Sequence, residues 1–222
     1  MESVRMTIAF RIIISLIVLW AFLFIPAGSL LYLEGWGYLA ALLIPMLFAA
    51  VYLLKYDPGL LERRGKMEER EPAQKRIVIV FSIFFFAGFL LAPLDWRFGW
   101  SEVPFPVVLA ADAIIVLGYV IVFLTFRENS YASRVVEVEK GQQVVSTGPY
   151  ALVRHPMYLG VLLMVLCTPP ALGSWWALVP ILPLPFLLAL RIRNEEKVLA
   201  EELPGYREYR EKTRYRLIPY LW

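Results

Sequence analysis

The chain has 222 residues, of which 59% are hydrophobic and only 18% are charged, and its formal net charge is +3. A soluble domain of this size rarely carries so few charged side chains, so the composition favours an integral membrane protein, and we expect no nucleic-acid partner. Cys167 is the one cysteine and His155 the one histidine. This excludes an intramolecular disulfide and argues against a histidine- or cysteine-based metal site.

Apolar segments of spanning length follow one another along the chain. A helix needs about 20 mostly apolar residues to cross the hydrocarbon core. We expect six spans or near-spans, the first a retained helix rather than a cleaved signal, at about 7–25, 36–54, 77–94, 105–126, 155–170 and 175–190. The expected fold class is therefore all-α: a polytopic bundle of transmembrane helices that ends in a short helical hairpin.

The hairpin is expected from the last two apolar segments. The fifth segment is short, and Thr168-Pro169-Pro170 followed by Gly173-Ser174 is typical of a turn between helices. Such a short pair of helices need not reach the far side of the bilayer.

Basic residues fall almost entirely on one side of this expected bundle. With the N-terminus inside, only Arg97 of the 22 Lys and Arg residues lies in an outer loop, and Arg11 lies just inside the first helix. Cytoplasmic loops carry such an excess of basic residues. We therefore expect a multi-pass protein with both termini and the active site on the cytoplasmic side.

Two polar inner segments connect the expected spans. Residues 57–76 mix both signs of charge, as a solvated or interfacial connecting helix does. Residues 127–153 are also polar, and the pattern at 135–138 favours a short strand or a turn. The sequence contains no internal repeat or linker. We expect one membrane domain over 1–222, with four helices in 1–126 and the catalytic part in 127–222.

A polar stretch precedes the fifth helix on the inner side. Pro156 suits the first helical position, where its missing N–H costs nothing. The N–H groups of Met157, Tyr158 and Leu159 are then expected to point out of the helix end and to attract an anion. The alternative is an ordinary membrane helix start, with Arg154 and His155 reaching the headgroups.

A charged stretch follows the sixth segment. Arg191 and Glu195 are four residues apart, and Arg193 and Glu196 are three apart, so each pair shares a helix face. The alternatives are two surface ion pairs, each worth about 0–1 kcal/mol, or a functional cluster at the membrane face. The hairpin is expected to bring four side chains to one pocket: His155, Tyr158, Arg191 and Glu196.

The order of these motifs is specific. The chain reads Arg-His-Pro-x-Tyr-x-Gly at 154–160, Arg-x-x-x-Glu-Glu at 191–196, Gly-Tyr-x-x-Tyr at 205–209 and Arg-Leu-Ile-Pro at 216–219. This arrangement resembles the isoprenylcysteine carboxyl methyltransferase family and, more distantly, the phospholipid N-methyltransferases. The resemblance covers about 144–222. The stretch 203–206 is one residue shorter than is usual in the family, and the first four helices carry no motif of it.

The resemblance implies methyl transfer from S-adenosylmethionine inside the membrane, with no metal. It implies an acceptor that is lipid-like or a small hydrophobic molecule, best matched by the carboxylate of a prenylated cysteine, and contacts with membrane lipids. Arg191 would orient that carboxylate through two parallel hydrogen bonds. The implied roles are cofactor binding by Tyr150, His155, Pro156, Tyr158, Glu195 and Glu196, catalysis by Arg191 and Glu196, and acceptor binding by Arg191, Tyr206 and Tyr209.

Several alternatives remain open at this point. The acceptor is alternatively a phospholipid amine or a thiol. An NADPH-dependent membrane sterol-type reductase is another alternative, because the tail at 215–219 resembles that of sterol reductases. A transporter or scaffold is the third alternative. It is disfavoured because the first four spans carry few charges, chiefly Arg11 and Asp112.

Overall fold

The protein is a bundle of long helices in the computed structural model, which describes residues 2–65, 71–132, 135 and 138–222, with side chains described from residue 14 onward except at 15. Those residues contain no β-strand. The helices are α1 (Glu2–Ala27), α2 (Leu33–Tyr56), α3 (Pro58–Gly65), α4 (Pro72–Phe98), α5 (Phe105–Glu128), the 3₁₀ helix η1 (Gly148–Ala151), α6 (Pro156–Ala171), α7 (Leu178–Ile181), α8 (Leu184–Glu202) and α9 (Tyr206–Lys212).

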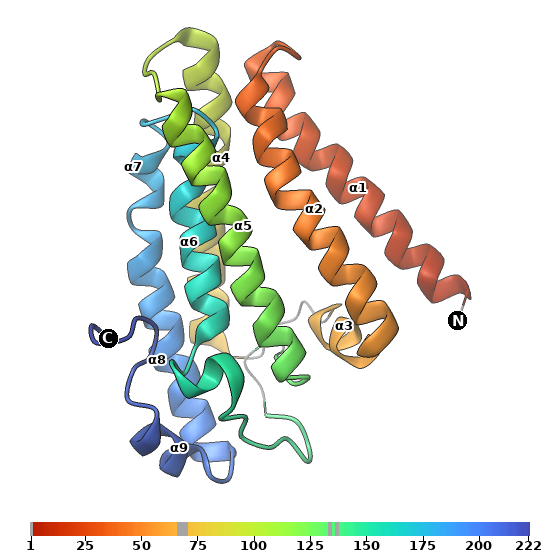
Figure 1. Cartoon of the computed structure of the whole chain (residues 1–222), viewed down its shortest axis with the longest axis vertical. Helices are drawn as coiled ribbons and strands as arrows, with labels where there is room; N and C mark the ends of the chain where they lie inside the picture. Colours follow the sequence, from red (N-terminus) through yellow and green to blue (C-terminus); the bar gives the residue numbers. More distant parts are fainter. Residues whose placement is uncertain (1, 66–70, 133–134, 136–137) are drawn as a thin grey trace.

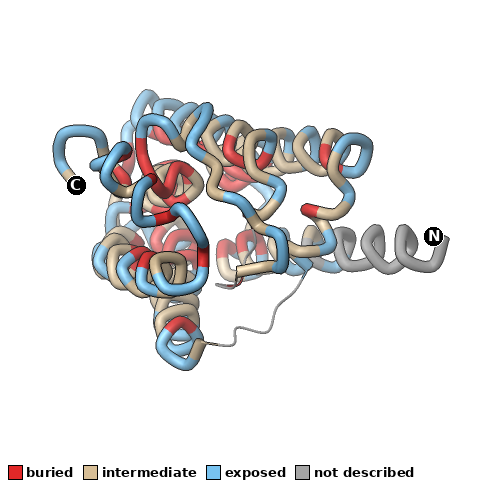
Figure 2. Tube along the Cα trace, turned by 90° about the horizontal axis from the view of Figure 1, so that it is seen from below, coloured by how far each residue is buried: buried red, intermediate tan, exposed pale blue. Residues whose placement is uncertain are grey.

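The long helices run side by side, and the polar segments gather at one end of the bundle. Figure 1 shows α3 and α9 at this end, which we call the inner end, and both chain termini lie toward it. Seen from the inner end, buried positions face the spaces between helices and exposed positions lie outside (Figure 2). On α2, for example, Ile44, Phe48 and Val51 are 68%, 63% and 66% exposed. Such a row of exposed apolar side chains is typical of a helix face in contact with lipid.

Three of the described helices are long and apolar enough to cross a membrane. They are α2, α4 and α5, while Leu16–Ala27 of α1 and the whole of α6 are shorter apolar helices. The expectation of an all-helical membrane protein is confirmed for the described residues. The number of six spans stays a prediction.

The C-terminal hairpin turns later than the sequence indicated. Pro169 and Pro170 belong to the last turn of α6 rather than to the connection. The chain reverses at Gly173, whose φ of +71° lies in the left-handed region that glycine adopts without steric cost. A further proline, Pro183, separates α7 from α8.

The polar segment before α6 contains no strand in its described part. Residues 136–137 of the expected strand or turn lie outside the described residues. The remainder, apart from η1, forms turns and irregular chain. The inner connection after α2 contains a helix, α3, at Pro58–Gly65, within the range where a connecting helix was expected.

A buried polar cluster holds the hairpin turn at the outer end. Asp95, at the end of α4, is fully buried. Its carboxylate accepts hydrogen bonds from the N–H and hydroxyl of Ser101, at 2.7 and 2.6 Å, and from the hydroxyl of Ser174. The cluster thereby attaches the turn to α4.

Close packing of α5 against α6 explains one glycine of the motif. A Cβ placed on Gly160 would lie 2.5 Å from the carbonyl oxygen of Gly118. Any side chain at Gly160 would therefore push the two helices apart. The glycine is required for the approach of α6 to α5, and this approach positions the start of α6.

The hairpin topology can be tested by labelling. In a Cys167→Ser background, Lys140→Cys and Trp176→Cys each place a thiol at an exposed position, at opposite ends of the bundle. We expect a membrane-impermeant maleimide to label the two cysteines from opposite sides of intact vesicles. Labelling of both from one side would contradict a bundle that spans the bilayer in this orientation.

Candidate functional site

A buried carboxylate, Glu196 of α8, lies at the centre of an ion cluster at the inner end. Its Oε1 accepts a hydrogen bond from Nε of Arg154 at 2.6 Å, and its Oε2 accepts one from Nε of Arg216 at 2.8 Å. Nε2 of His155 is 3.4 Å from Oε1. Burial acts to raise the pKa of Glu196, but these three side chains outweigh burial and hold the pKa well below its usual range.

The same cluster holds the C-terminal tail against the start of α6. Nη1 of Arg154 donates to the carbonyl oxygens of residues 213 and 214, at 2.8 Å each. The backbone N–H groups of residues 154 and 155 donate to the carbonyl oxygens of residues 215 and 216, at 2.9 Å each. Arg154, for which a headgroup contact was one of the two alternatives, is 7% exposed and joins the start of α6 to α8 and the tail.

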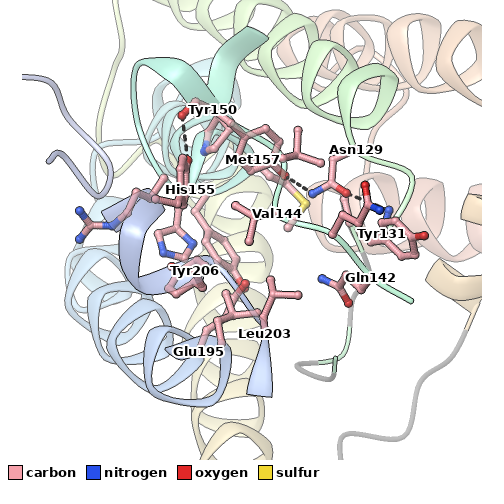
Figure 3. A pocket seen from close by; sticks show the side chains of 18 of the residues that line it. Asn129, Tyr131, Gln142, Val144, Tyr150, His155, Met157, Glu195, Leu203 and Tyr206 are labelled. Carbon is pink, nitrogen blue, oxygen red and sulfur yellow. Dashed lines mark hydrogen bonds between the residues drawn. The ribbon is translucent and has the colours of Figure 1, made fainter. Parts of the chain in front are cut away.

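A polar pocket opens beside this cluster, with an empty volume of about 780 Å³ that includes space open to solvent. The end of α5, the 142–145 segment, η1, α6, α8 and α9 line it. Figure 3 shows His155, Glu195 and Tyr206 on one side of the pocket and Asn129, Tyr131 and Gln142 on the other. The structure brings together in this pocket seven of the residues predicted from the sequence: Tyr150, His155, Pro156, Tyr158, Glu195, Tyr206 and Tyr209.

Two buried polar atoms in the lining of this pocket have no hydrogen-bond partner among the described residues. They are the hydroxyl of Tyr206 and Nε2 of His155, and the residues are only 4% and 5% exposed. The 3.4 Å contact between Nε2 of His155 and Glu196 is electrostatic and lacks the geometry of a hydrogen bond. Burial raises the pKa of Tyr206, and burial raises that of Tyr209 to about 12, so both phenols stay protonated near neutral pH. Unsatisfied buried polar atoms are unfavourable, and a polar ligand would satisfy these two.

An apolar pocket lies between α4, α6 and α8, with an empty volume of about 1290 Å³ that includes open space. Phe81, Phe85 and Leu188 are among its mainly hydrocarbon lining, and Arg64 and Arg191 supply positive charge. The polar and apolar pockets share three lining residues: Val135, Met157 and Tyr158. Two ligands, one bound in each pocket, would therefore lie next to each other, on either side of these three side chains.

The hydroxyl of Tyr158 connects the two pockets by hydrogen bonds. It accepts one from Nε of Arg191 at 3.0 Å and donates one to Oε2 of Glu195 at 2.7 Å. Arg191 lines the apolar pocket and Glu195 the polar one. The four-residue spacing of Arg191 and Glu195 thus places both around one tyrosine.

Two parts of the site differ from the sequence-based picture. Glu196 lines neither of the two pockets but a groove on another side of α8, and Arg191 is separated from the polar pocket by Tyr158. The N–H groups of Tyr158 and Leu159 donate to the carbonyl oxygen of His155, at 3.1 and 3.3 Å. They are therefore not open to an anion, because the first turn of α6 closes on itself.

Sequence reasoning missed three contributors to the site. Asn129 donates to the hydroxyl of Tyr150 at 2.9 Å. Gln74 of α4 bonds to Arg191, and Arg216 bonds to Glu196. Arg216 lies inside the Arg-Leu-Ile-Pro motif, so a signal for it existed. Gln74 and Asn129 lie outside every motif, and each is one of several polar residues in its stretch, so no sequence signal singled it out.

Comparison with known proteins adds to this geometry. The phospholipid methyltransferase family matches residues 107–204, from α5 through α8. The cobalt-zinc-cadmium resistance protein CzcN of Cupriavidus metallidurans is 28% identical over 140 residues, which are 62% of this chain and 59% of that protein. The Delta(14)-sterol reductase TM7SF2 of Mus musculus is 32% identical over 107 residues, 44% of this chain and 25% of that protein.

The matched region contains most of the candidate site. The chain aligns with less than two thirds of the length of either relative. The family match at residues 107–204 includes α6 and α8, which contribute residues to the lining of both pockets. Residues 107–204 of this chain are therefore similar to the phospholipid methyltransferase family.

Proposed function

We propose that the protein is an integral membrane methyltransferase that uses S-adenosylmethionine and acts on an amphipathic, lipid-like acceptor. The observation that carries this proposal is the junction of a polar and an apolar pocket at Met157 and Tyr158. A soluble methyl donor and an acceptor with a hydrocarbon tail need such different, adjoining environments. The distribution of basic residues favours the cytoplasmic side for both pockets.

The residues of the polar pocket fit the proposed cofactor. When bound, S-adenosylmethionine supplies a methyl group that leaves its sulfonium by in-line displacement. Glu195 provides negative charge for a cationic group, and Nε2 of His155 and the hydroxyl of Tyr206 provide polar contacts that the protein leaves unsatisfied. Charged hydrogen bonds of this kind are about twice as strong as neutral ones. The chain's task is alignment and exclusion of water rather than acid–base chemistry.

The apolar pocket suits an acceptor with an acidic headgroup. Its aromatic lining takes a hydrocarbon chain, and Arg191 and Arg64 lie in the same lining. A guanidinium aligns a carboxylate by two parallel hydrogen bonds, and a carboxylate is nucleophilic without a general base. We therefore propose an acidic lipid-like acceptor, of which the carboxylate of a prenylated cysteine is the best match. A phospholipid amine or a thiol remains the alternative.

Glu196 supports the site from outside the two pockets. Its carboxylate is engaged with Arg154 and Arg216, and these contacts hold His155 and the tail in place. The geometry favours this supporting role over the direct cofactor contact predicted from the sequence. Tyr206 and Tyr209 line the polar pocket, so we propose that they close over the cofactor rather than over the acceptor.

A reductase is the second candidate function, because a sterol reductase aligns with part of the chain. Such an enzyme would use the polar pocket for a nicotinamide cofactor. The two candidates differ in which cofactor binds, so direct binding separates them.

We expect calorimetry on the protein in lipid nanodiscs to show binding of S-adenosylmethionine and none of NADPH. His155→Ala and Tyr206→Phe should each weaken that binding by about 1–3 kcal/mol, because each removes a polar contact in a buried pocket. Tyr52→Phe is the matched control, because the Tyr52 ring packs against Phe123 and does not line the pocket. Binding of NADPH alone would favour the reductase, and unchanged affinity in both variants would exclude this pocket as the cofactor site.

A further inference from the structure

We infer that Gln74, in the first turns of α4, is a positioning residue that fixes the guanidinium of Arg191 at the apolar pocket. The inference rests on the proposed function, in which Arg191 aligns the headgroup of the acceptor. It gives Gln74, which lies in no recognisable motif, an indirect part in the site.

The side chain of Gln74 forms two hydrogen bonds with Arg191. Its Oε1 accepts a hydrogen bond from Nη1 of Arg191 at 3.1 Å, and its Nε2 donates one to the backbone carbonyl oxygen of Arg191 at 3.1 Å. A guanidinium only donates and a carbonyl oxygen only accepts, so chemistry fixes which end of the amide faces which group. Gln74 is 0% exposed, and both contacts are therefore shielded from water.

A second contact fixes the orientation of the guanidinium. Nε of Arg191 donates to the hydroxyl of Tyr158 at 3.0 Å. Two different nitrogens of one planar group are thus held by two different helices, α4 and α6. A guanidinium held at two nitrogens can no longer rotate about the bonds of the arginine side chain. Its alignment with a ligand then costs less conformational entropy at the moment of binding.

Gln74 acts through Arg191 and not on a ligand directly. The described lining of the apolar pocket includes Arg191 but not Gln74. Loss of the glutamine should therefore affect the acceptor and leave the methyl donor almost untouched. A glutamine that only stabilised the packing of α4 on α8 would instead change both in proportion to the amount of folded protein.

The test is a double-mutant cycle with tritiated S-adenosylmethionine and a native membrane lipid extract as the acceptor source. In the otherwise unchanged protein, Gln74→Leu is expected to raise the apparent KM for the extract by about 10-fold, the loss expected when one hydrogen bond to a charged group is removed. The KM for S-adenosylmethionine should change by less than about twofold. In an Arg191→Lys background, which lacks the planar fork, Gln74→Leu should change the acceptor KM by about threefold at most.

Thr125→Val is the matched control, since Thr125 is also fully buried near the inner end but its hydroxyl donates to Ile121 of its own helix. Additive effects of Gln74→Leu and Arg191→Lys, or equal changes in both KM values, would overturn the inference while leaving the proposed function standing. If the unchanged protein neither binds S-adenosylmethionine nor labels the extract, the proposed function fails first. Gln74→Glu provides a second variant if Gln74→Leu does not fold.

Discussion

Glu196→Gln is expected to destabilise the protein by about 3–5 kcal/mol, because it leaves a buried arginine without its counter-charge. The residue Arg154 is 7% exposed, so water cannot replace the lost partner. The same guanidinium holds the carbonyl oxygens of residues 213 and 214, and the tail should therefore loosen together with the ion pair. The measurement is the thermal unfolding midpoint of purified protein in a single detergent.

The control for this variant is Glu202→Gln, in the same helix. Glu202 is exposed, and its replacement should change stability by about 0.5 kcal/mol at most. Arg216→Gln is a milder test of the same cluster, because the Arg216 side chain is 29% exposed. A midpoint for Glu196→Gln equal to that of the unchanged protein would show that the cluster does not hold the tail.

The pH dependence of stability gives an independent check on Glu196. The pKa of its carboxyl is below the usual range in the folded protein. The stabilisation from its ion pairs is therefore fully present above the unfolded pKa of about 4.3 and is lost as the pH falls below it toward the folded pKa. The stability difference between the unchanged protein and Glu196→Gln should accordingly be constant near neutral pH and shrink below about pH 5.

Tyr158→Phe is expected to slow methyl transfer by about 10- to 100-fold, while the protein remains folded. The substitution removes one hydroxyl that bonds to both Arg191 and Glu195. Hydrogen bonds to charged groups are worth about 1.5–3 kcal/mol, and each 1.4 kcal/mol of barrier is about tenfold in rate. The orientation of both charged side chains should relax at the junction of the two pockets. The measurement is a single-turnover rate at saturating S-adenosylmethionine.

Tyr52→Phe again serves as the control, because the Tyr52 ring packs against Phe123 and lines neither pocket. A normal single-turnover rate in Tyr158→Phe would mean that the hydroxyl bridge has no part in transfer. A rate loss that disappears at higher concentrations of membrane extract would instead assign Tyr158 to acceptor binding, as distinct from the transfer step.

The expected helices follow from local properties of the chain. Long apolar runs have to form helices in lipid, where every backbone polar group needs an internal partner, and α2, α4 and α5 lie within a few residues of their expected bounds. The motif order likewise predicted which segments meet: seven of the predicted residues line the polar pocket. The end of α6 was predicted too early. Pro169 and Pro170 lie in its last helical turn, and the sequence does not distinguish this position from one in the turn that follows.

The sequence by itself determined the membrane class and the helical elements, because hydrophobicity and helical period are properties of neighbouring residues. Only the tertiary structure decided which side chain faces which. Glu195 and Glu196 are adjacent and so point about 100° apart on α8, but the chain's distant segments determine which of them meets the pocket. The partners of Glu196 are 42 and 20 residues away, and Gln74 is 117 residues from Arg191. No local pattern encodes such contacts, because they arise when the helices pack.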